Sequence, residues 1–329
     1  MLTKALKGRD FISLMDFNKE ELETIFDVAF NLKRKIALGE PQDNLLKNKT
    51  LAMIFANPST RTRTSFEAAM TQLGGHAQFH TPEVMQIAHH ETWIDTARVL
   101  DRYVDGIMIR MYGLEKYGQA REILKLMSAN ANIPLFNALD DKEHPFQIMA
   151  DIMTMIEKLG PNWKSKKIVM SWAYSGRVKS AGVPQTMAIA ASLLGMNLTL
   201  AYPEKYDVDP DYMAFANNAA EKSGAKINVV HDVFDAAKDA DVIYAKSWGS
   251  FLMSKEEDTE YRKQFKENWK ISKKHFDLAK KQAIFMHCLP ADRNLEVTDE
   301  IIDGPMSVVY DEAENRLHTE KAILALSMK

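Results

Sequence analysis

The sequence predicts an α/β protein of two domains, each built on a parallel β-sheet flanked by helices. Short β-rich apolar runs alternate with stretches of helical periodicity along the whole chain, an order typical of such sheets. The length of 329 residues exceeds what one ordinary hydrophobic core covers. A Gly-Pro pair followed by a basic run, KLGPNWKSKK at residues 158–167, indicates a boundary after a long helix. We therefore divide the chain near residue 150.

Each half of the chain is expected to contain several strands and helices. The expected strands are residues 50–56, 76–80, 104–110, 133–136, 167–172, 197–202, 226–230, 241–245, 283–286 and 307–310. The expected helices are residues 63–73, 91–101, 116–129, 145–159, 183–194 and 210–223. We expect a first domain of residues 1–150, on which the last helical stretch, 314–327, packs back, and a second domain of residues 151–313.

The bulk composition indicates a globular protein and disfavours several classes of partner. Apolar residues make up 46% and charged residues 26% of the chain, and the net charge is −3. Nothing in this balance favours nucleic acid or an anionic membrane surface. The only cysteine, Cys288, excludes an internal disulfide bond and favours a reducing compartment. With neither an apolar signal segment nor a membrane-spanning run, we expect a cytoplasmic protein.

The sequence carries no motif for a common cofactor. No G-x-G-x-x-G follows an expected strand, which disfavours a nicotinamide-dependent dehydrogenase, and no G-x-x-x-x-G-K-[ST] run supports a P-loop kinase. His89, His90 and Glu91 resemble a metal cluster. Adjacent residues on a helix, however, diverge by roughly 100° and suit joint ligation poorly. We expect neither a metal nor a cofactor.

Residues 57–67, NPSTRTRTSFE, place two arginines and three threonines between an expected strand and an expected helix. Backbone N–H groups at a helix start attract anions, and hydroxyl groups add donors. Arginine adds a forked, permanently charged pair of donors that fits phosphate oxygens. Arg61 and Arg63 point to different helix faces, so at most one reaches a given anion. On composition alone, a phosphate site and an ordinary capped helix start with solvated arginines have equal weight.

Further polar residues follow other expected strands, where ligands of open parallel sheets bind. Arg110 ends the strand at 104–110, and a plain surface arginine is the alternative interpretation. His144 and Gln147 lie three positions apart at a helix start, which can also be a simple helix entry led by proline. The run HCLP at residues 287–290 offers backbone carbonyls to an N–H donor. We expect its cysteine to be inert and not a nucleophile.

Together these segments resemble the carbamoyltransferases, the family of the aspartate and ornithine transcarbamylases. Residues 59–67 are similar to the family's carbamoyl-phosphate signature, S-T-R-T-R followed by S-F-E. Similarity to the ornithine branch covers HPFQ (144–147), HCLP (287–290), DTARVLDRYVDG (95–106) and DEAENRLHTEKA (311–322). The resemblance implies a transcarbamylase fold with a carbamoyl-phosphate-binding domain before an amino-acid-binding domain. It also implies a homotrimer with active sites shared between subunits, and no cofactor.

The resemblance implies roles for individual residues. Arg110 and His144 polarise the carbonyl oxygen of carbamoyl phosphate with help from Thr62, and Gln147 and the Leu289 carbonyl hold its NH2 group. The implied catalytic residues are Arg61, Thr62, Arg110 and His144. The implied carbamoyl-phosphate-binding residues are Ser59, Thr60, Arg61, Thr62, Gln86, Arg110, His144, Gln147, Cys288, Leu289 and Arg316. Gln86 belongs to a loop, residues 85–92, that resembles the segment lent by a neighbouring subunit.

The similarity to the ornithine branch breaks after the strand at 241–245. That branch carries an aspartate in a D-x-x-x-S-M-G pattern, which binds the α-ammonium of the acceptor, whereas this chain reads YAKSWGS at residues 244–250. Lys246 suits a carboxylate or carbonyl better than an ammonium group. The expected acceptor-binding residues are Lys246, Trp248 and Leu289. YAKSWG and the WAY stretch resemble the N-acylornithine and unassigned-substrate transcarbamylases, a branch with a knot in the second domain.

We therefore expect a carbamoyltransferase of amino-acid metabolism, in arginine biosynthesis, that uses carbamoyl phosphate and an ornithine-like amine, N-acylated or otherwise modified. The alternative is an ornithine carbamoyltransferase that makes citrulline, because the loop at residues 80–92 is as short as in the ornithine enzymes. A non-catalytic carbamoyl-phosphate-binding paralogue is the alternative from another class. The joint presence of Arg61, Arg110, His144 and Gln147 favours an enzyme.

Overall fold

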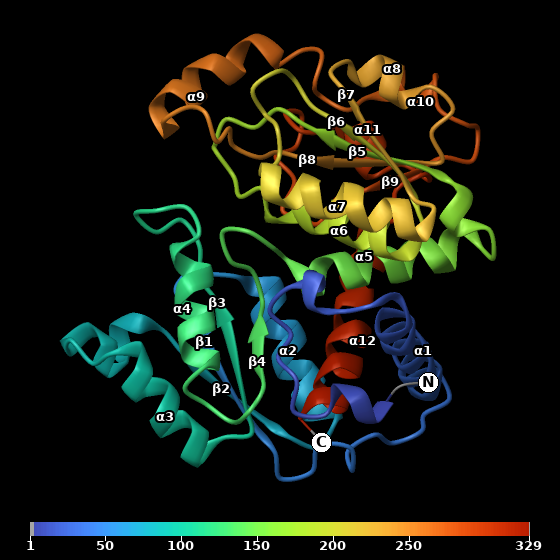
Figure 1. The fold of residues 1–329 in the computed structure, drawn as a ribbon. Helices are drawn as coiled ribbons and strands as arrows, with labels where there is room; N and C mark the ends of the chain where they lie inside the picture. Colours follow the sequence, from blue (N-terminus) through green and yellow to red (C-terminus); the bar gives the residue numbers. More distant parts are fainter. Residues whose placement is uncertain (1–2, 329) are drawn as a thin grey trace. The chain divides into compact units, whose positions relative to one another are not determined.

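The computed structural model describes residues 3–328 and divides into two compact units (Figure 1). Unit 1 comprises the described residues up to Ala150 together with those from Glu314 onward, and unit 2 comprises Asp151–Ala313. Each unit contains one sheet, and every strand pair in both sheets is parallel. The predicted α/β class, with a helix-flanked parallel sheet in each of two domains, is therefore confirmed.

Unit 1 is built around a four-stranded sheet with the strand order β2-β1-β3-β4. The strands are β1 (Thr50–Phe55), β2 (His76–His80), β3 (Gly106–Arg110) and β4 (Leu135–Asn137). The helices are α1 (Lys19–Ala37), α2 (Thr60–Gln72), α3 (Trp93–Tyr103), α4 (Gln119–Ser128), the start of α5 (Pro145–Leu159) and most of α12 (Val309–Ser327). Figure 1 shows α3 and α4 on one side of this sheet and α2 and α12 on the other.

The central strands of unit 1 are buried on both faces, which explains their nearly continuous apolar sequence. Ala52 and Ile54 of β1 pack in one hydrophobic cluster with Ala97 of α3 and Leu124 of α4. Aromatic rings fill other parts of the interior, and the ring of Phe146 lies edge-on to several of them. The two-sided core holds the carboxyl ends of β1, β3 and β4 in fixed register.

Unit 2 is built around a five-stranded sheet with the strand order β7-β6-β5-β8-β9. The strands are β5 (Lys167–Trp172), β6 (Asn197–Ala201), β7 (Lys226–Val230), β8 (Val242–Lys246) and β9 (Ile284–Met286). The helices are α6 (Gly182–Leu194), α7 (Pro210–Ser223), α8 (Val233–Ala237), α9 (Lys255–Tyr261), α10 (Lys273–Phe276) and α11 (Asp299–Ile302). All but one residue of α6 is buried, as expected for a helix between a sheet and a second helix.

Most of the expected strands are confirmed to within two residues at each end, but the strand expected at 307–310 is wrong. Ser307 forms one isolated parallel bridge to Phe285, and α12 already begins at Val309. The pairing stops there because the acidic residues Asp311 and Glu312 suit the first turn of a helix. The predicted last helix therefore starts five residues earlier than expected. None of the helices in the described chain combines the length and the apolar character needed to cross a bilayer.

Candidate active site

Polar residues gather after the carboxyl ends of the strands in each unit, where ligands of parallel sheets bind. In unit 1, Phe55 of β1 is the register partner of Arg110 on β3, which brings Arg110 beside the loop that leads into α2. In unit 2, Trp172 of β5 is the register partner of Lys246 on β8. Each of these strand ends carries one of the residues singled out in the sequence, and the two groups are described in turn.

The first polar residues of unit 1 lie at the N-terminus of α2. The side chain of Ser59 caps the helix by accepting a hydrogen bond from the backbone N–H of Thr62, at 3.3 Å. Thr60 and Arg61 occupy the first turn, which contains no acidic residue. Helix N–H groups without a nearby carboxylate leave a positive end that attracts anions.

Two arginines meet at the hydroxyl group of Thr62. Nη1 of Arg110 lies 3.5 Å from Thr62 Oγ1, and Nη2 of Arg316 lies 3.3 Å from the same oxygen. Arg110 also donates to the carbonyl of Ala138 at 3.3 Å, and Arg316 donates to Gln147 Oε1 at 2.8 Å. The structure thus brings together residues from β3, α2, α5 and α12.

The charge of this cluster is strongly positive. Burial, together with the neighbouring charges of Arg316 and Arg61, lowers the pKa of Arg110. The carboxylate that faces the cluster is Glu320, which accepts from Nε and Nη2 of Arg316 at 3.1 and 2.8 Å. Burial raises the pKa of Glu320 from 4.5 to about 7, although Arg316 opposes this shift. Three guanidinium groups with one weakly acidic partner form a site that an anion would stabilise.

Arg63 is engaged on the other side of α2. Its Nε donates to Glu67 at 2.9 Å, and its guanidinium carbon lies 3.7 Å from the ring centroid of Phe79. Arg61 is exposed at the helix start. The two arginines therefore differ in their surroundings, as their spacing predicts.

The remaining residues predicted in unit 1 lie at helix starts. His144 is buried directly before Pro145, the first residue of α5, and Gln147 is buried in the first turn of the helix. Gln86 is exposed at the start of a short 3-10 helix, η4 (Gln86–His89). A role for Gln86 in a neighbouring subunit, and the homotrimer itself, stay predictions.

In unit 2 the HCLP run forms a tight turn after β9. The backbone N–H of His287 donates to Glu312 at 3.0 Å, and the N–H of Leu289 donates to His287 Nδ1 at 2.8 Å. Leu289 has a positive φ of 52°, which is uncommon outside glycine. Cys288 is half-buried, and burial raises the pKa of its thiol, which disfavours the reactive thiolate.

Lys246 is a buried cation at the end of β8. Its Nζ donates to the carbonyl of Ser247, and burial lowers its pKa. The backbone N–H of the next residue, Ser247, donates to the carboxylate of Glu296 at 2.9 Å, and Lys179 Nζ donates to the same carboxylate at 2.7 Å. Burial opposes ionisation of Glu296, but His287, Lys179 and Lys246 hold its pKa well below its usual range. These contacts place buried groups of both charges together after β8.

Trp248 lies in the interior of unit 2. It is fully buried, and its indole N–H donates to the carbonyl of Tyr206 at 2.8 Å. Its own carbonyl accepts from the indole N–H of Trp172 at 2.9 Å. The indole therefore supports the chain around Lys246, while a direct contact with the acceptor stays a prediction.

Several residues of these groups were not predicted from the sequence. Glu320 lies four positions after Arg316 on α12, a spacing typical of helical ion pairs, and that spacing could have identified it. Glu296 lies 50 positions after Lys246 and has no such local signal. The described residues contain no group of three His, Cys, Asp or Glu side chains that could hold a metal ion.

Comparison with protein families and known proteins gives one consistent result. The carbamoyl-phosphate-binding domain of aspartate/ornithine carbamoyltransferase matches residues 9–157, and the Asp/Orn-binding domain matches residues 169–327. The chain is 44% identical over 324 residues to the ornithine carbamoyltransferase of Thermococcus kodakarensis, with 98% of both chains covered. It is likewise 44% identical over 324 residues to the anabolic ornithine carbamoyltransferase of Pyrococcus furiosus, with 98% of both chains covered.

Two solved structures are similar over nearly their whole length. Ornithine carbamoyltransferase from Pyrococcus furiosus matches with a TM-score of 0.88 and 43% identity, covering 98% of both chains. An acetylornithine transcarbamylase complexed with acetylcitrulline matches with the same TM-score of 0.88 but 33% identity, covering 96% of this chain and 98% of the other. The fold is shared with both kinds of enzyme.

Proposed function

The chain belongs to the aspartate/ornithine carbamoyltransferase family, and we propose that it transfers the carbamoyl group of carbamoyl phosphate to the side-chain amine of ornithine. The products are citrulline and inorganic phosphate. The observation that carries the donor half of this proposal is the meeting of Arg110 and Arg316 on the Thr62 hydroxyl at the positive end of α2. That arrangement suits a small, doubly charged acyl phosphate better than a neutral ligand.

In this proposal unit 1 binds carbamoyl phosphate. The phosphate group takes the α2 N-terminus, with the hydroxyls of Ser59 and Thr60 and the guanidinium of Arg61 as donors. Arg110 and His144 donate to the carbonyl oxygen, and Gln147 holds the NH2 group. For Cys288 and Leu289, in the HCLP turn of unit 2, the role implied by the resemblance stays a prediction.

The chemistry needs no covalent enzyme intermediate. The neutral amine attacks the carbonyl carbon, so a new C–N bond forms while negative charge grows on the carbonyl oxygen. The C–O bond to phosphate then breaks, and the departing phosphate accepts the proton of the amine. Fixed donors at both oxygens lower the barrier, typically by about 3 kcal/mol for each well-placed one. Holding the amine and the carbonyl carbon together contributes a further entropic term.

Free ornithine is the acceptor that the relatives support. The relatives at 44% identity named above are ornithine carbamoyltransferases, whereas the acetylornithine enzyme is 33% identical. The N-acylated acceptor expected from the sequence therefore has less support than its alternative. In unit 2 the carboxylate of Asp292, whose side chain is 16% exposed, offers a partner for the α-ammonium of ornithine.

N-Acylated ornithine remains the second candidate, on one specific observation. Lys246 holds a buried ammonium group where its charge opposes a free α-ammonium and favours a carbonyl or carboxylate. The similar acetylornithine transcarbamylase was solved with acetylcitrulline, which carries such a carbonyl.

An acceptor panel tests the proposal. The purified protein is incubated with carbamoyl phosphate and one of ornithine, N-acetylornithine, N-succinylornithine or aspartate, and both the ureido product and phosphate are measured. The proposal expects the highest kcat/KM with ornithine. Preference for an N-acyl compound would move the assignment to the second candidate. Binding of carbamoyl phosphate without turnover of any amine would instead identify a non-catalytic paralogue.

A further inference from the structure

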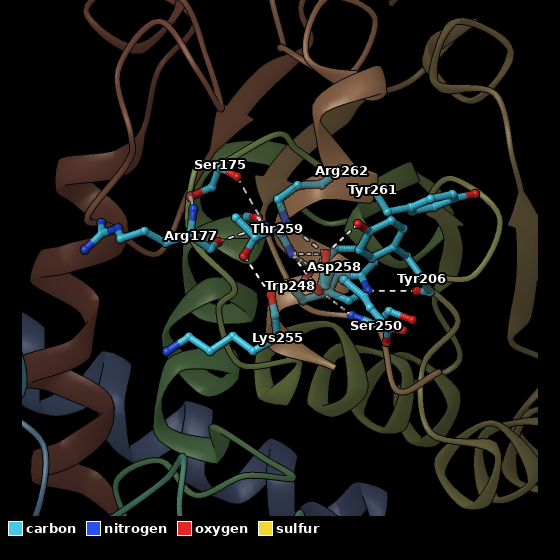
Figure 2. A network of polar contacts seen from close by, with 12 residues as sticks. Ser175, Arg177, Tyr206, Trp248, Ser250, Lys255, Asp258, Thr259, Tyr261 and Arg262 are labelled. Carbon is cyan, nitrogen blue, oxygen red and sulfur yellow. Dashed lines mark hydrogen bonds and ion pairs between the residues drawn. The ribbon is translucent and has the colours of Figure 1, made fainter. Parts of the chain in front are cut away.

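A fully buried ion pair in unit 2 contacts the segment that follows Lys246, and neither of its residues is among those assigned to catalysis. Arg262 begins the short 3-10 helix η6 (Arg262–Phe265), directly after α9, and Asp258 lies one turn before it on α9. Their side chains are 0% and 1% exposed. Arginine and aspartate are almost never fully buried unless they are paired. Figure 2 shows the two at the centre of a network of polar contacts.

The pair itself is bidentate. Nε of Arg262 donates to Asp258 Oδ1 at 2.9 Å, and Nη2 donates to Oδ2 at 2.9 Å. The guanidinium carbon also lies within 6 Å of the ring centroids of Trp172 and Tyr206, at 5.7 and 5.8 Å. Such fork geometry fixes the plane of the guanidinium and aims its remaining N–H groups.

Those remaining N–H groups reach two connections that follow strands. After β5, the carbonyls of Ser175 and Arg177 accept from Nη1 at 3.2 and 2.8 Å. After β8, the Ser247 hydroxyl accepts from Nη1 at 3.3 Å, and the Trp248 carbonyl accepts from Nη2 at 3.2 Å. One guanidinium therefore holds both loops at the carboxyl edge of the sheet.

Asp258 extends the network to a third connection and to the end of the second. The Tyr206 hydroxyl, which follows β6, donates to Oδ1 at 2.6 Å. The N–H of Ser250 donates to Oδ2 at 3.0 Å. The segment from Lys246 to Ser250 is thus held from two sides by a single ion pair.

We propose that Arg262 is a positioning residue for the acceptor: it fixes the Lys246–Ser250 segment and the loop after β5 and thereby sets acceptor affinity. It acts through the backbone carbonyls and the hydroxyl that it binds and does not touch either substrate. The inference rests on the proposed function, because it requires that unit 2 binds the amine acceptor.

The fork of Arg262, and not its charge, is the feature that matters. A lysine keeps the charge, but its single nitrogen cannot hold both oxygens of Asp258 and the carbonyls of both loops at once. The lost contacts would leave buried carbonyls without donors and the two loops free to shift. The carbamoyl-phosphate residues of unit 1 make none of these contacts.

The test compares Arg262→Lys with Lys263→Gln in steady-state kinetics with ornithine and carbamoyl phosphate. Lys263 is the adjacent residue, and its side chain forms an exposed pair with Glu260, so its variant is the matched control. We expect Arg262→Lys to raise the KM for the acceptor at least 10-fold, with the KM for carbamoyl phosphate within 2-fold of the wild type. Lys263→Gln should leave both KM values unchanged.

A folded Arg262→Lys protein with an unchanged acceptor KM, or with both KM values raised equally, would overturn the inference. If Arg262→Lys does not fold, Tyr206→Phe replaces it, because this variant removes only the hydroxyl that donates to Asp258. Its KM for the acceptor is expected to rise about 3-fold. An unchanged KM in Tyr206→Phe would also overturn the inference. Wild-type protein without turnover of any amine overturns the proposed function, and this inference with it. If the wild type is active and the variants leave the acceptor KM unchanged, only the role of Arg262 is overturned and the proposed function stands.

Discussion

Nη1 of Arg316 lies 2.8 Å from Oε1 of Gln147, although the two residues are 169 positions apart in the chain. The contact joins the last helix of unit 1 to the start of α5. The same guanidinium reaches the Thr62 hydroxyl at 3.3 Å. One side chain therefore orients both the amide proposed to hold the carbamoyl NH2 group and the hydroxyl at the proposed phosphate site.

Replacement of Arg316 by lysine tests this arrangement. Arg316→Lys keeps the charge but loses the fork that reaches Gln147, Thr62 and Glu320 together. We expect kcat/KM for carbamoyl phosphate to fall about 10- to 100-fold, since charge-assisted hydrogen bonds are typically worth about 1.5–3 kcal/mol each. Steady-state kinetics at varied carbamoyl phosphate would measure it. A kcat/KM within 2-fold of the wild type would exclude this role.

Arg61 and Arg63 form a matched pair for a binding test. Arg61→Ala should weaken binding of carbamoyl phosphate about 10- to 100-fold, because it removes a charged donor from the start of α2. Arg63→Ala should change affinity little, because Arg63 is engaged with Glu67 and Phe79. Calorimetry with carbamoyl phosphate and the two variants measures both constants. Equal effects of the two substitutions would contradict the assignment of the phosphate to this helix start.

Periodicity and strand-end logic predict much of this architecture, because the strands are apolar runs bounded by clear breaks. Residues 145–159 and 210–223 were predicted as helices and match α5 and α7 at both ends. Both helices begin with proline and have regular apolar spacing, so local sequence signals are enough to predict where they begin and end. The strand expected at 307–310 does not form, because its pairing with Phe285 is limited to one bridge. The extent of that pairing depends on tertiary structure and cannot be predicted from local composition.

The buried charges could not be predicted in the same way. Asp258 and Arg262 look like an ordinary surface pair at i, i+4, and only the fold buries both. Lys246 was predicted as an acceptor residue, but its burial and its partner network with Glu296 and Lys179 depend on loops far apart in sequence. The sequence identifies the residue types at strand ends, but the desolvation that shifts their pKa values arises only from packing.

Cys288 should be dispensable for chemistry. Phosphate is already a good leaving group, and burial raises the pKa of the thiol, so little thiolate is available. Cys288→Ser is therefore expected to keep at least a tenth of wild-type kcat. Turnover and far-UV circular dichroism check activity and folding together. Complete loss of turnover in a folded variant, with a carbamoyl thioester trapped on the wild type, would reverse this conclusion.

The stability of unit 1 against unfolding is expected to depend on pH through Glu320. Its pKa is raised from 4.5 to about 7 in the folded chain, so the folded state binds this proton more tightly than the unfolded state. The associated stabilisation is fully present below pH 4.5 and is lost as pH rises through 7, by at most about 3 kcal/mol. Glu320→Gln removes the titration and keeps a side-chain oxygen for Arg316.

The stability of Glu320→Gln relative to the wild type should therefore increase between pH 5 and pH 8. Denaturant unfolding at several pH values measures this difference, whatever the offset at pH 5. Asp311→Asn is the matched control: its side chain is on the same helix, 41% exposed and paired with Lys158, and the variant should show no such trend. A relative stability that does not change with pH would mean that Glu320 does not titrate in this range.

We expect the choice of acceptor to depend on the charge of Lys246. Two like charges roughly 4 Å apart cost on the order of 4 kcal/mol at intermediate dielectric, which disfavours a free α-ammonium beside this lysine. Burial lowers the pKa of Lys246, however, and so reduces the energy needed to remove its charge. Glu296 and Asp292 also lie nearby and offset its field. These two effects reduce the repulsion that the proposed acceptor, ornithine, would meet at this position.

Lys246→Met and Lys246→Asp separate the two acceptors. Each removes the opposing ammonium group, and aspartate adds a partner for the α-ammonium of ornithine. We expect the ratio of kcat/KM for ornithine to that for N-acetylornithine to rise at least 10-fold in Lys246→Asp. The rise should be smaller in Lys246→Met, because only aspartate supplies an attractive charge.

Lys255→Met, at an exposed lysine of α9, is the control and should leave the ratio unchanged. Lys246→Met has no carboxylate to bury beside Glu296, so it is the safer variant for folding. If the ratio stays at the wild-type value in both folded variants, Lys246 does not face the α-nitrogen, and acceptor selectivity must arise elsewhere in unit 2.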